Sequence, residues 1–300
     1  MSKEFAIIGG DARISYLAKM LSKSNDKVYV YGQNEHIIEE QKSSKLYENL
    51  KELIFCNTLE EAVKSAEIII SSIPFSKDGI NIYSPFSKEQ IKIESLIQKL
   101  KNKTLFAGSI SKEIAEQLEV NNVKVVDLMK QEDLTILNTI ATAEGAISDI
   151  ILNTETNIHG SKILILGFGR VAKVLAKKLA GLDAKVTCAA RKEKDFAWME
   201  ALGFEKTNIN NLGENLKKFD IIINTVPQMI LEKNRLNNVK QDCLLLDLAS
   251  KPGGIDQQAC KELDLKFIWA LAIPGKVAPI TSAKYIKETI EKIIKEGADN

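Results

Sequence analysis

The stretch that decides the fold reads Lys162-Ile163-Leu164-Ile165-Leu166-Gly167-Phe168-Gly169-Arg170-Val171-Ala172. A short apolar run is followed by a glycine turn and the start of a helical pattern, and residues 167–172 match the G-x-G-x-x-G/A fingerprint of dinucleotide-binding domains. An isolated match is weak, but a second apolar strand follows here at residues 186–189. The context predicts a Rossmann-type domain from about residue 162 to about residue 279.

Each small residue of this motif has a physical role. Gly167 permits the tight turn, Gly169 lets the backbone approach a pyrophosphate, and Ala172 lets the helix pack closely on the sheet. The first N–H groups of the helix then face the phosphates. The residues of the turn that we expect at the cofactor are Gly167, Gly169, Arg170 and Val171.

The end of the second strand indicates which dinucleotide binds. An NAD enzyme usually has Asp or Glu there, whereas this chain reads Ala189-Ala190-Arg191-Lys192. Arg191 and Lys192 suit a 2′-phosphate, so the sequence favours NADP over NAD. The alternative is a solvated basic turn.

Two later loops follow strands of the same domain, at the edge where open α/β sheets bind ligands. One is residues 224–227 and the other is residues 247–254. We expect four of their residues at the cofactor, unless these loops are only turns: Asn224, Thr225, Pro227 and Asp247.

Apolar strands alternate with helical patterns along the whole chain, which predicts an α/β protein with two Rossmann-like, doubly wound parallel sheets. We expect the first domain at residues 1–137 and the NADP-binding domain at residues 138–282, with the helix at 283–300 packing back on the first. A long helix at residues 138–154 connects the domains, and the charged residues 35–52 are expected to form a solvated helical face with its connecting loop. We expect the substrate in a cleft between the domains.

The first domain begins with a similar turn, Gly9-Gly10-Asp11-Ala12-Arg13, but Arg13 stands where the third small residue belongs. We therefore expect no dinucleotide there and instead an anion site, with Arg13 pointing into the crevice. Ser109 is a further candidate at a loop of this domain. In the connecting helix, Thr142 and Glu144 are expected at the cleft, with N-capping by Asn138 or Thr139 as the alternative.

Composition narrows the function classes. A formal net charge of +1 argues against a nucleic-acid binder. No uninterrupted apolar run reaches the ~20 residues of a membrane helix, and residues 1–5 lead directly into a strand, so we expect a cytoplasmic protein. Four widely spaced cysteines and two histidines predict neither a disulfide nor a metal site.

The motifs taken together resemble the dipicolinate synthase A subunits of spore-forming bacteria. The segments that carry the resemblance run in order along nearly the whole chain: residues 8–13, 138–145, 158–161, 166–170, 190–191, 224–227, 246–254 and 274–279. One departure is Ala141, where the family's pattern has proline before Thr142. The two-domain arrangement is also similar to that of D-2-hydroxyacid dehydrogenases.

The resemblance implies oxidation of a dihydrodipicolinate to aromatic dipicolinate during sporulation, with NADP reduced. It also implies a partner, a flavoprotein-like B subunit. A dicarboxylate substrate needs cations, for which the candidates are Arg13, Lys251 and Lys276. The candidate bases are Glu144 and then Asp247. His159 precedes a strand, at the wrong end of the sheet, so a structural role is expected for it.

We expect the protein to form a homo-oligomer. Two other functions are also compatible with the sequence. One is a hydroxyacid or amino-acid dehydrogenase of the same architecture, although no histidine after His159 is present to form the usual His–carboxylate pair. The other is a regulatory subunit that binds NADP without turning over substrate.

Overall fold

The computed structural model describes residues 3–24, 26–34 and 53–298. The charged stretch 35–52 therefore lies outside the described residues. The chain divides into two compact units, one of residues 1–137 with 278–300 and one of residues 138–277. The second unit thus ends at Val277 rather than at the expected residue 282, because the last helix already begins at Pro279.

The first unit holds a six-stranded parallel sheet in the order β3-β2-β1-β4-β5-β6. Its strands are β1 Glu4–Ile8, β2 Lys27–Tyr31, β3 Leu53–Phe55, β4 Ile68–Ser71, β5 Thr104–Ala107 and β6 Lys124–Asp127. Its helices are α1 Ala12–Ser22, α3 Leu59–Lys64, α4 Ile93–Ile97, α5 Lys112–Val120, the 3-10 turn η3 Leu128–Lys130, the first residues of α6 Glu132–Asn153, and α12 Pro279–Ala298.

The second unit repeats this arrangement, with the order β12-β11-β10-β7-β8-β9 and all neighbours parallel. Its strands are β7 Lys162–Leu166, β8 Lys185–Ala190, β9 Glu205–Asn208, β10 Ile221–Asn224, β11 Leu244–Asp247 and β12 Lys266–Trp269. Its helices are α7 Arg170–Gly181, α8 Glu193–Ala201, the 3-10 turns η4 Ile209–Asn211 and η5 Gly213–Lys218, α9 Lys233–Leu236, α10 Gln257–Glu262 and α11 Ile273–Val277. Both sheets have the doubly wound Rossmann order, which confirms the predicted fold class.

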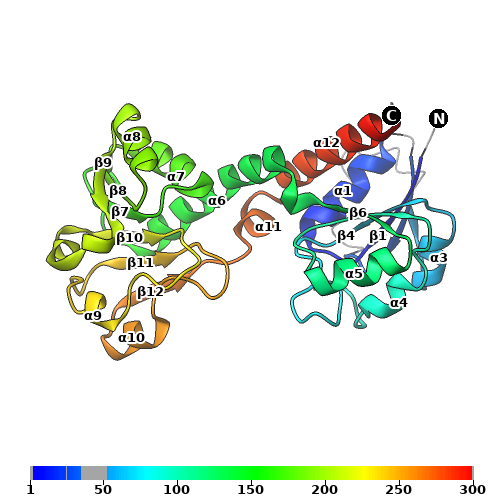
Figure 1. Ribbon diagram of the computed structural model, residues 1–300, viewed down its shortest axis with the longest axis horizontal. Coiled ribbons are helices and arrows are strands. Elements are labelled where there is room, and N and C mark those ends of the chain that lie inside the picture. Colours follow the sequence, from blue (N-terminus) through cyan, green and yellow to red (C-terminus); the bar gives the residue numbers. More distant parts are fainter. Residues whose placement is uncertain (1–2, 25, 35–52, 299–300) are drawn as a thin grey trace. The chain divides into compact units, whose positions relative to one another are not determined.

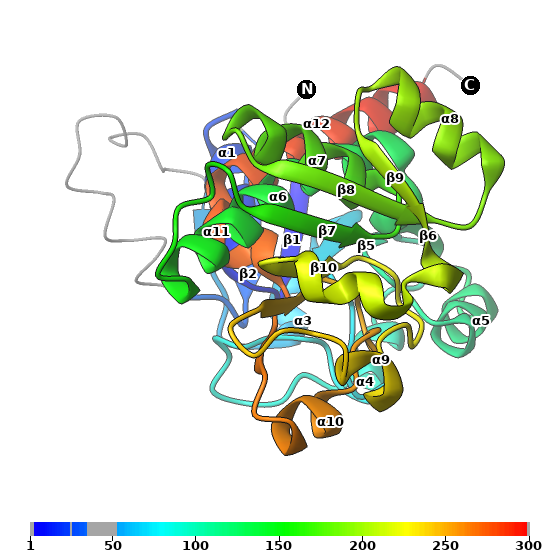
Figure 2. The same cartoon turned by 90° about the vertical axis from the view of Figure 1, so that its left-hand side faces the viewer.

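Each sheet has helices on both faces. In the first unit α3, α4 and α5 cover one face, and α1 and α12 pack side by side on the other (Figure 1). In the second unit α6, α7 and α8 cover one face, and α9 and α10 cover the other (Figure 2). Because both faces are buried, the central strands are apolar throughout rather than alternating.

Helix α6 begins at Glu132, six residues before the expected start, with Glu132 and Asp133 in its first turn. Asn138 and Thr139 therefore lie inside the helix and do not cap it. By length and composition alone α6 would be able to cross a membrane, but half of that window is buried. Leu134 packs in the core of the first unit and Ile150 in that of the second, as in a core helix.

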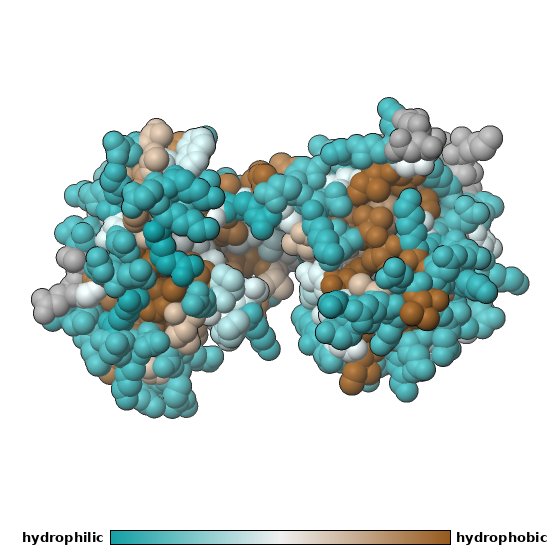
Figure 3. Space-filling view, viewed as in Figure 1, coloured by the Kyte–Doolittle hydropathy of each residue, from teal (hydrophilic) through white to brown (hydrophobic). Residues whose placement is uncertain are grey.

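One face of the first unit keeps an apolar groove. Figure 3 shows apolar side chains gathered over β6, between α5 and α12. The groove has a volume of 630 Å³, and Val125, Val126 and Ile293 contribute its apolar lining. It lies along β6, the edge strand of this sheet.

The packing of α12 predicts how strongly this helix stabilises the first unit. Ile290 is fully buried among the side chains of that core, so Ile290→Ala should lower the free energy of unfolding by about 2–5 kcal/mol. The control is Ile280→Ala on the same helix, where the side chain is 49% exposed and the expected change is under about 1 kcal/mol. Chemical denaturation measures both, and equal effects would contradict this account of α12.

Candidate functional site

The glycine turn between β7 and α7 is open. Gly167 has a positive φ of 96°, and a Cβ there would lie 2.6 Å from Thr225 Oγ1, so only glycine fits. At Gly169, by contrast, no atom lies within 4 Å of where a Cβ would stand. Gly169 caps α7 without a side-chain hydrogen bond, so the first turn of this helix can offer backbone N–H groups to an anion.

The corresponding turn of the first unit is closed by its own chain. A Cβ at Gly9 would meet Ile82 Cγ2 at 3.0 Å and Ser84 Cβ at 3.1 Å, and Gly10 N–H donates to Tyr83 O at 2.9 Å. The Gln33 side chain, just after β2, donates to Gly9 O. The segment of residues 82–84 therefore packs directly on this turn. At the start of α1 the Asp11 carboxylate caps the helix by accepting from Arg13 N, whereas Gly169 leaves the start of α7 without a side-chain cap. This contrast supports the expectation that only the second glycine turn holds the dinucleotide.

Arg13 does not point freely into a crevice, which corrects one expectation. Its Nε and Nη2 donate to Asp11 at 2.9 and 2.8 Å, and Nη2 also donates to the carbonyl of Ile73 at 2.5 Å. Arg13 is 7% exposed, and Asp11 caps α1 as well. With both hydrogens of Nη2 engaged, the two-pronged contact expected for a substrate carboxylate is not available, and only Nη1 remains for a ligand.

The loops after β10 and β11 are tied together by Asp247. This carboxylate is 1% exposed and accepts four hydrogen bonds: from Asn224 Nδ2 at 2.8 Å, Ala249 N at 2.9 Å, Gly254 N at 2.7 Å and Ile255 N at 3.1 Å. Both oxygens are thereby fully engaged. Asp247 therefore shapes the loops and is not a free proton acceptor, which corrects its assignment as a candidate base.

Neighbouring contacts hold the same loops against the glycine turn. Thr225 Oγ1 donates to Leu166 O at 2.8 Å, where β7 ends. Trp269 Nε1 donates to Ala249 O at 2.9 Å, and the indole packs where a Cβ at Gly253 would stand. The expected cofactor residues of β7, β10 and β11 thus do come together at one edge of the sheet, and Pro227 follows there as an exposed residue.

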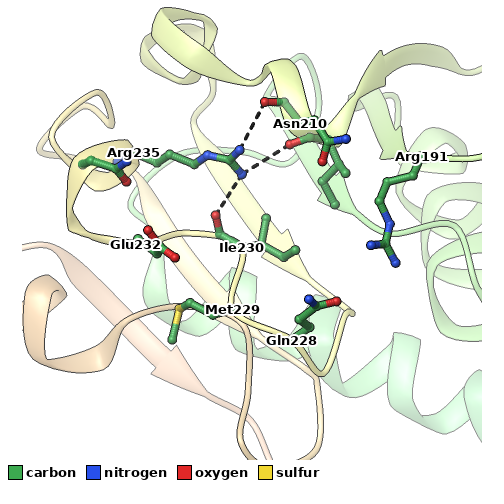
Figure 4. A pocket seen from close by; sticks show the side chains of 9 residues that line it. Arg191, Asn210, Gln228, Met229, Ile230, Glu232 and Arg235 are labelled. Carbon is green, nitrogen blue, oxygen red and sulfur yellow. Dashed lines mark hydrogen bonds between the residues drawn. The ribbon is translucent and has the colours of Figure 1, made fainter.

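A pocket of 230 Å³ opens beside Arg191, in the same unit (Figure 4). Arg191 and Lys192 are both exposed just after β8. The other lining residues were not predicted from the sequence: Ile209, Asn210, Gln228, Met229, Ile230, Glu232, Asn234 and Arg235. Most of them follow β9 and β10. Open α/β sheets bind ligands beyond the carboxyl ends of their strands, and this rule could have identified these residues from the sequence.

The remaining candidates are scattered over the two units. Ser109 is exposed after β5, in a left-handed conformation (φ 55°) that its N–H bond to Asp127 holds. Thr142 Oγ1 donates to Asn138 O within α6, and the half-exposed Glu144 accepts from Lys178 Nζ at 2.9 Å.

The two candidate lysines are both exposed. Lys251 lies in the loop after β11 and Lys276 in α11. Burial raises the pKa of Asp149, and the positive charge of nearby Lys276 partly offsets this rise. Lys276 therefore already faces one carboxylate of its own unit.

Three of the cysteines are buried, and His159 lies at the surface. Cys188 and Cys243 are buried thiols, and burial raises the pKa of each to about 12, so both are neutral at physiological pH. His159 is exposed, with Nδ1 at 3.3 Å from Asp183 Oδ2, before β7 begins.

Two family models match the chain. The model for the N-terminal domain of the dipicolinate synthase A subunit matches residues 4–129. The model described as D-isomer specific 2-hydroxyacid dehydrogenase, NAD binding domain, matches residues 141–260. The first match lies in the first unit and the second in the second unit, which contains the open glycine turn.

Full-length relatives share the sequence and the fold. The dipicolinate synthase A subunit of Bacillus subtilis (strain 168) is 30% identical over 296 residues, covering 98% of this chain and 96% of the relative. The crystal structure of the dipicolinate synthase A subunit from Bacillus halodurans has a TM-score of 0.84 at 28% identity, covering 97% of each chain. That of the same protein from Bacillus subtilis has a TM-score of 0.84 at 29% identity, covering 100% of this chain and 98% of the other.

The open space at Gly169 predicts that a side chain placed there abolishes cofactor binding. Gly169→Val would place a branched side chain where the pyrophosphate is expected, so dinucleotide binding should fall below detection while the fold is kept. Calorimetric titration measures the binding, and thermal unfolding checks the fold.

The matched control is Gly181→Val at the other end of α7, where a Cβ also meets no atom within 4 Å. Binding to this variant should be unchanged. Unchanged binding in Gly169→Val as well would show that the dinucleotide does not use this turn.

Proposed function

Since the chain belongs to the family of dipicolinate synthase A subunits, we propose that it oxidises dihydrodipicolinate to dipicolinate, pyridine-2,6-dicarboxylate, with NADP as the oxidant. The NAD-binding dehydrogenase domain makes it an oxidoreductase that uses a nicotinamide cofactor. The observation that carries the finer proposal is the open glycine turn followed, at the end of β8, by Arg191 and no carboxylate.

The residues of the second unit fit such a cofactor. The N-terminus of α7, which no side chain caps, suits the pyrophosphate, and Arg191 suits a 2′-phosphate through its planar fork. Asp247 fixes the loop of residues 247–255 and joins it to Asn224, so that the ribose side of the site is preformed. When bound, NADP supplies the hydride acceptor, and the substrate loses one hydride and one proton as its ring becomes aromatic.

The substrate has two carboxylates, which need donors and cations. Arg13 Nη1, Ser109, Thr142, Lys251 and Lys276 are the candidates for the two carboxylates and their surroundings. Of the two proposed proton acceptors Glu144 remains, because its carboxylate is half exposed whereas that of Asp247 is buried and fully bonded.

The proposal also covers the cellular location, the oligomeric state and a partner protein. We place the protein in the cytoplasm of a spore-forming cell, as a homo-oligomer that works with a flavoprotein-like B subunit. These statements rest on the sequence and on the family resemblance. A hydroxyacid or amino-acid dehydrogenase is the second candidate activity, and an NADP-sensing subunit without turnover is the third.

A direct assay separates these candidates. The purified chain, with and without a B subunit, should reduce NADP when dihydrodipicolinate is added, and equal amounts of dipicolinate and NADPH should form. Absorbance at the nicotinamide band and chromatography of the product measure the two. NADP binding without any turnover in both preparations would favour the sensing role, and turnover of a hydroxyacid or an amino acid instead would favour the dehydrogenase.

Cofactor choice is tested at the end of β8. In Arg191→Asp a carboxylate replaces the exposed cation, so NADP binding should weaken by about 2 kcal/mol or more, through a lost charge-assisted contact and added repulsion. NAD binding should change far less or improve. The control is Lys194→Asp on α8, which makes the same charge change outside the pocket. If the unmodified protein binds NAD as tightly as NADP, the assignment is wrong.

A further inference from the structure

Two arginines line the pocket beside β8, and they differ in how they are held. Arg191 comes from the end of β8, whereas Arg235 belongs to α9 (Figure 4). No hydrogen bond or ion pair holds the Arg191 side chain among the described residues, and it is exposed. Arg235 is half-buried and bonded to the walls of the pocket.

Arg235 cross-links two segments that are distant in sequence. Its Nη1 donates to Ile230 O at 2.9 Å and to Ile209 O at 3.3 Å, and its Nη2 donates to Asn210 O at 3.2 Å. Ile209 and Asn210 follow β9, while Ile230 follows β10. The guanidinium therefore fixes the spacing of the two walls of the pocket.

All three acceptors of Arg235 are neutral carbonyls. Within the described part of the chain no carboxylate forms an ion pair with Arg235, although Glu232 also lines the pocket. Its positive charge is thus not cancelled by a direct partner, and with Arg191 it gives the pocket two cations against one carboxylate. An uncompensated guanidinium beside a cavity favours a bound anion.

A continuous chain of hydrogen bonds links this wall to the loop after β11. Ile230 N and Leu231 N donate to Gly254 O at 2.8 and 2.9 Å, and Gly254 N donates to Asp247 Oδ2 at 2.7 Å. Gly254 has no room for a side chain, because a Cβ would lie 2.7 Å from the carbonyl oxygens of Val226 and Gln228. The wall bonded to Arg235 is therefore anchored to the loop after β11.

We propose that Arg235 is a specificity-determining positioning residue for the 2′-phosphate of the adenine dinucleotide. It holds the wall formed by Asn210 and Ile230 in place and adds a second positive charge to the pocket that Arg191 opens. The inference rests on the proposed use of NADP. It assigns part of the preference for a 2′-phosphate to a residue 44 positions after Arg191.

The experiment uses two small probes that differ only in the phosphate at issue. The full chain is titrated with adenosine 2′,5′-bisphosphate and with adenosine 5′-monophosphate, and the ratio of the two dissociation constants gives the preference for the 2′-phosphate. Arg235→Met removes the charge and all donors at similar length, and it should lower this preference about 10- to 100-fold, the range for a lost charged contact.

Two further variants make the result specific. Arg235→Lys keeps the charge but cannot reach three carbonyls, so it should lower the preference by an intermediate factor. Lys233→Met removes a cation from the same helix that pairs with Glu262 at the surface, and it should leave the preference unchanged. Thermal unfolding is followed for every variant, and if Arg235→Met does not fold, the Arg235→Lys ratio decides.

The outcomes are distinct. If variants at Arg235 weaken both probes equally, or neither, Arg235 is only a structural tie and the inference is overturned. If the unmodified protein shows no preference for the 2′-phosphate, the proposed use of NADP fails instead. A preference that falls in the Arg235 variants and persists in Lys233→Met supports the inference.

Discussion

The buried carboxylate of Asp247 is the interaction on which the candidate cofactor site depends. Three backbone N–H groups and the side chain of Asn224 converge on it, so the loops after β10 and β11 take their shape from one residue. Leaving those donors unpaired would cost about 1–3 kcal/mol for each buried group. Through Gly254 the same carboxylate connects to Ile230 and Arg235, so one chain of hydrogen bonds joins both ends of the site.

The two units show how one architecture serves two purposes. Both have the same strand order and a glycine turn after the first strand. In the second unit the turn leads into a helix that no side chain caps, whereas in the first unit Asp11 caps the helix and residues 82–84 pack on the turn. The two units therefore differ at the glycine turn and the loop that packs on it rather than in the sheet.

The sequence could predict features that depend on neighbouring residues, and it could not predict those that depend on partners far along the chain. The strands β7 and β8, the glycine turn between β7 and α7 and the basic pair after β8 are local patterns, and all lie where the pattern placed them. The edge strands β3 and β9 were not predicted from the sequence. The roles of Arg13 and Asp247 depend on partners far along the chain: Arg13 donates to a carbonyl 60 residues away, and Asp247 accepts from a side chain 23 residues away. Arg235 was missed for the same reason, because backbone carbonyls carry no signal in the sequence.

The central claim is that the second glycine turn binds NADP with the 2′-phosphate beside Arg191. A crystal structure of the chain with NADP tests it most directly. The account predicts the pyrophosphate over Gly169 at the start of α7 and the 2′-phosphate within hydrogen-bond distance of Arg191, in the pocket that Arg235 shapes. A dinucleotide bound at residues 9–13, or a 2′-phosphate turned to solvent away from Arg191, would contradict it.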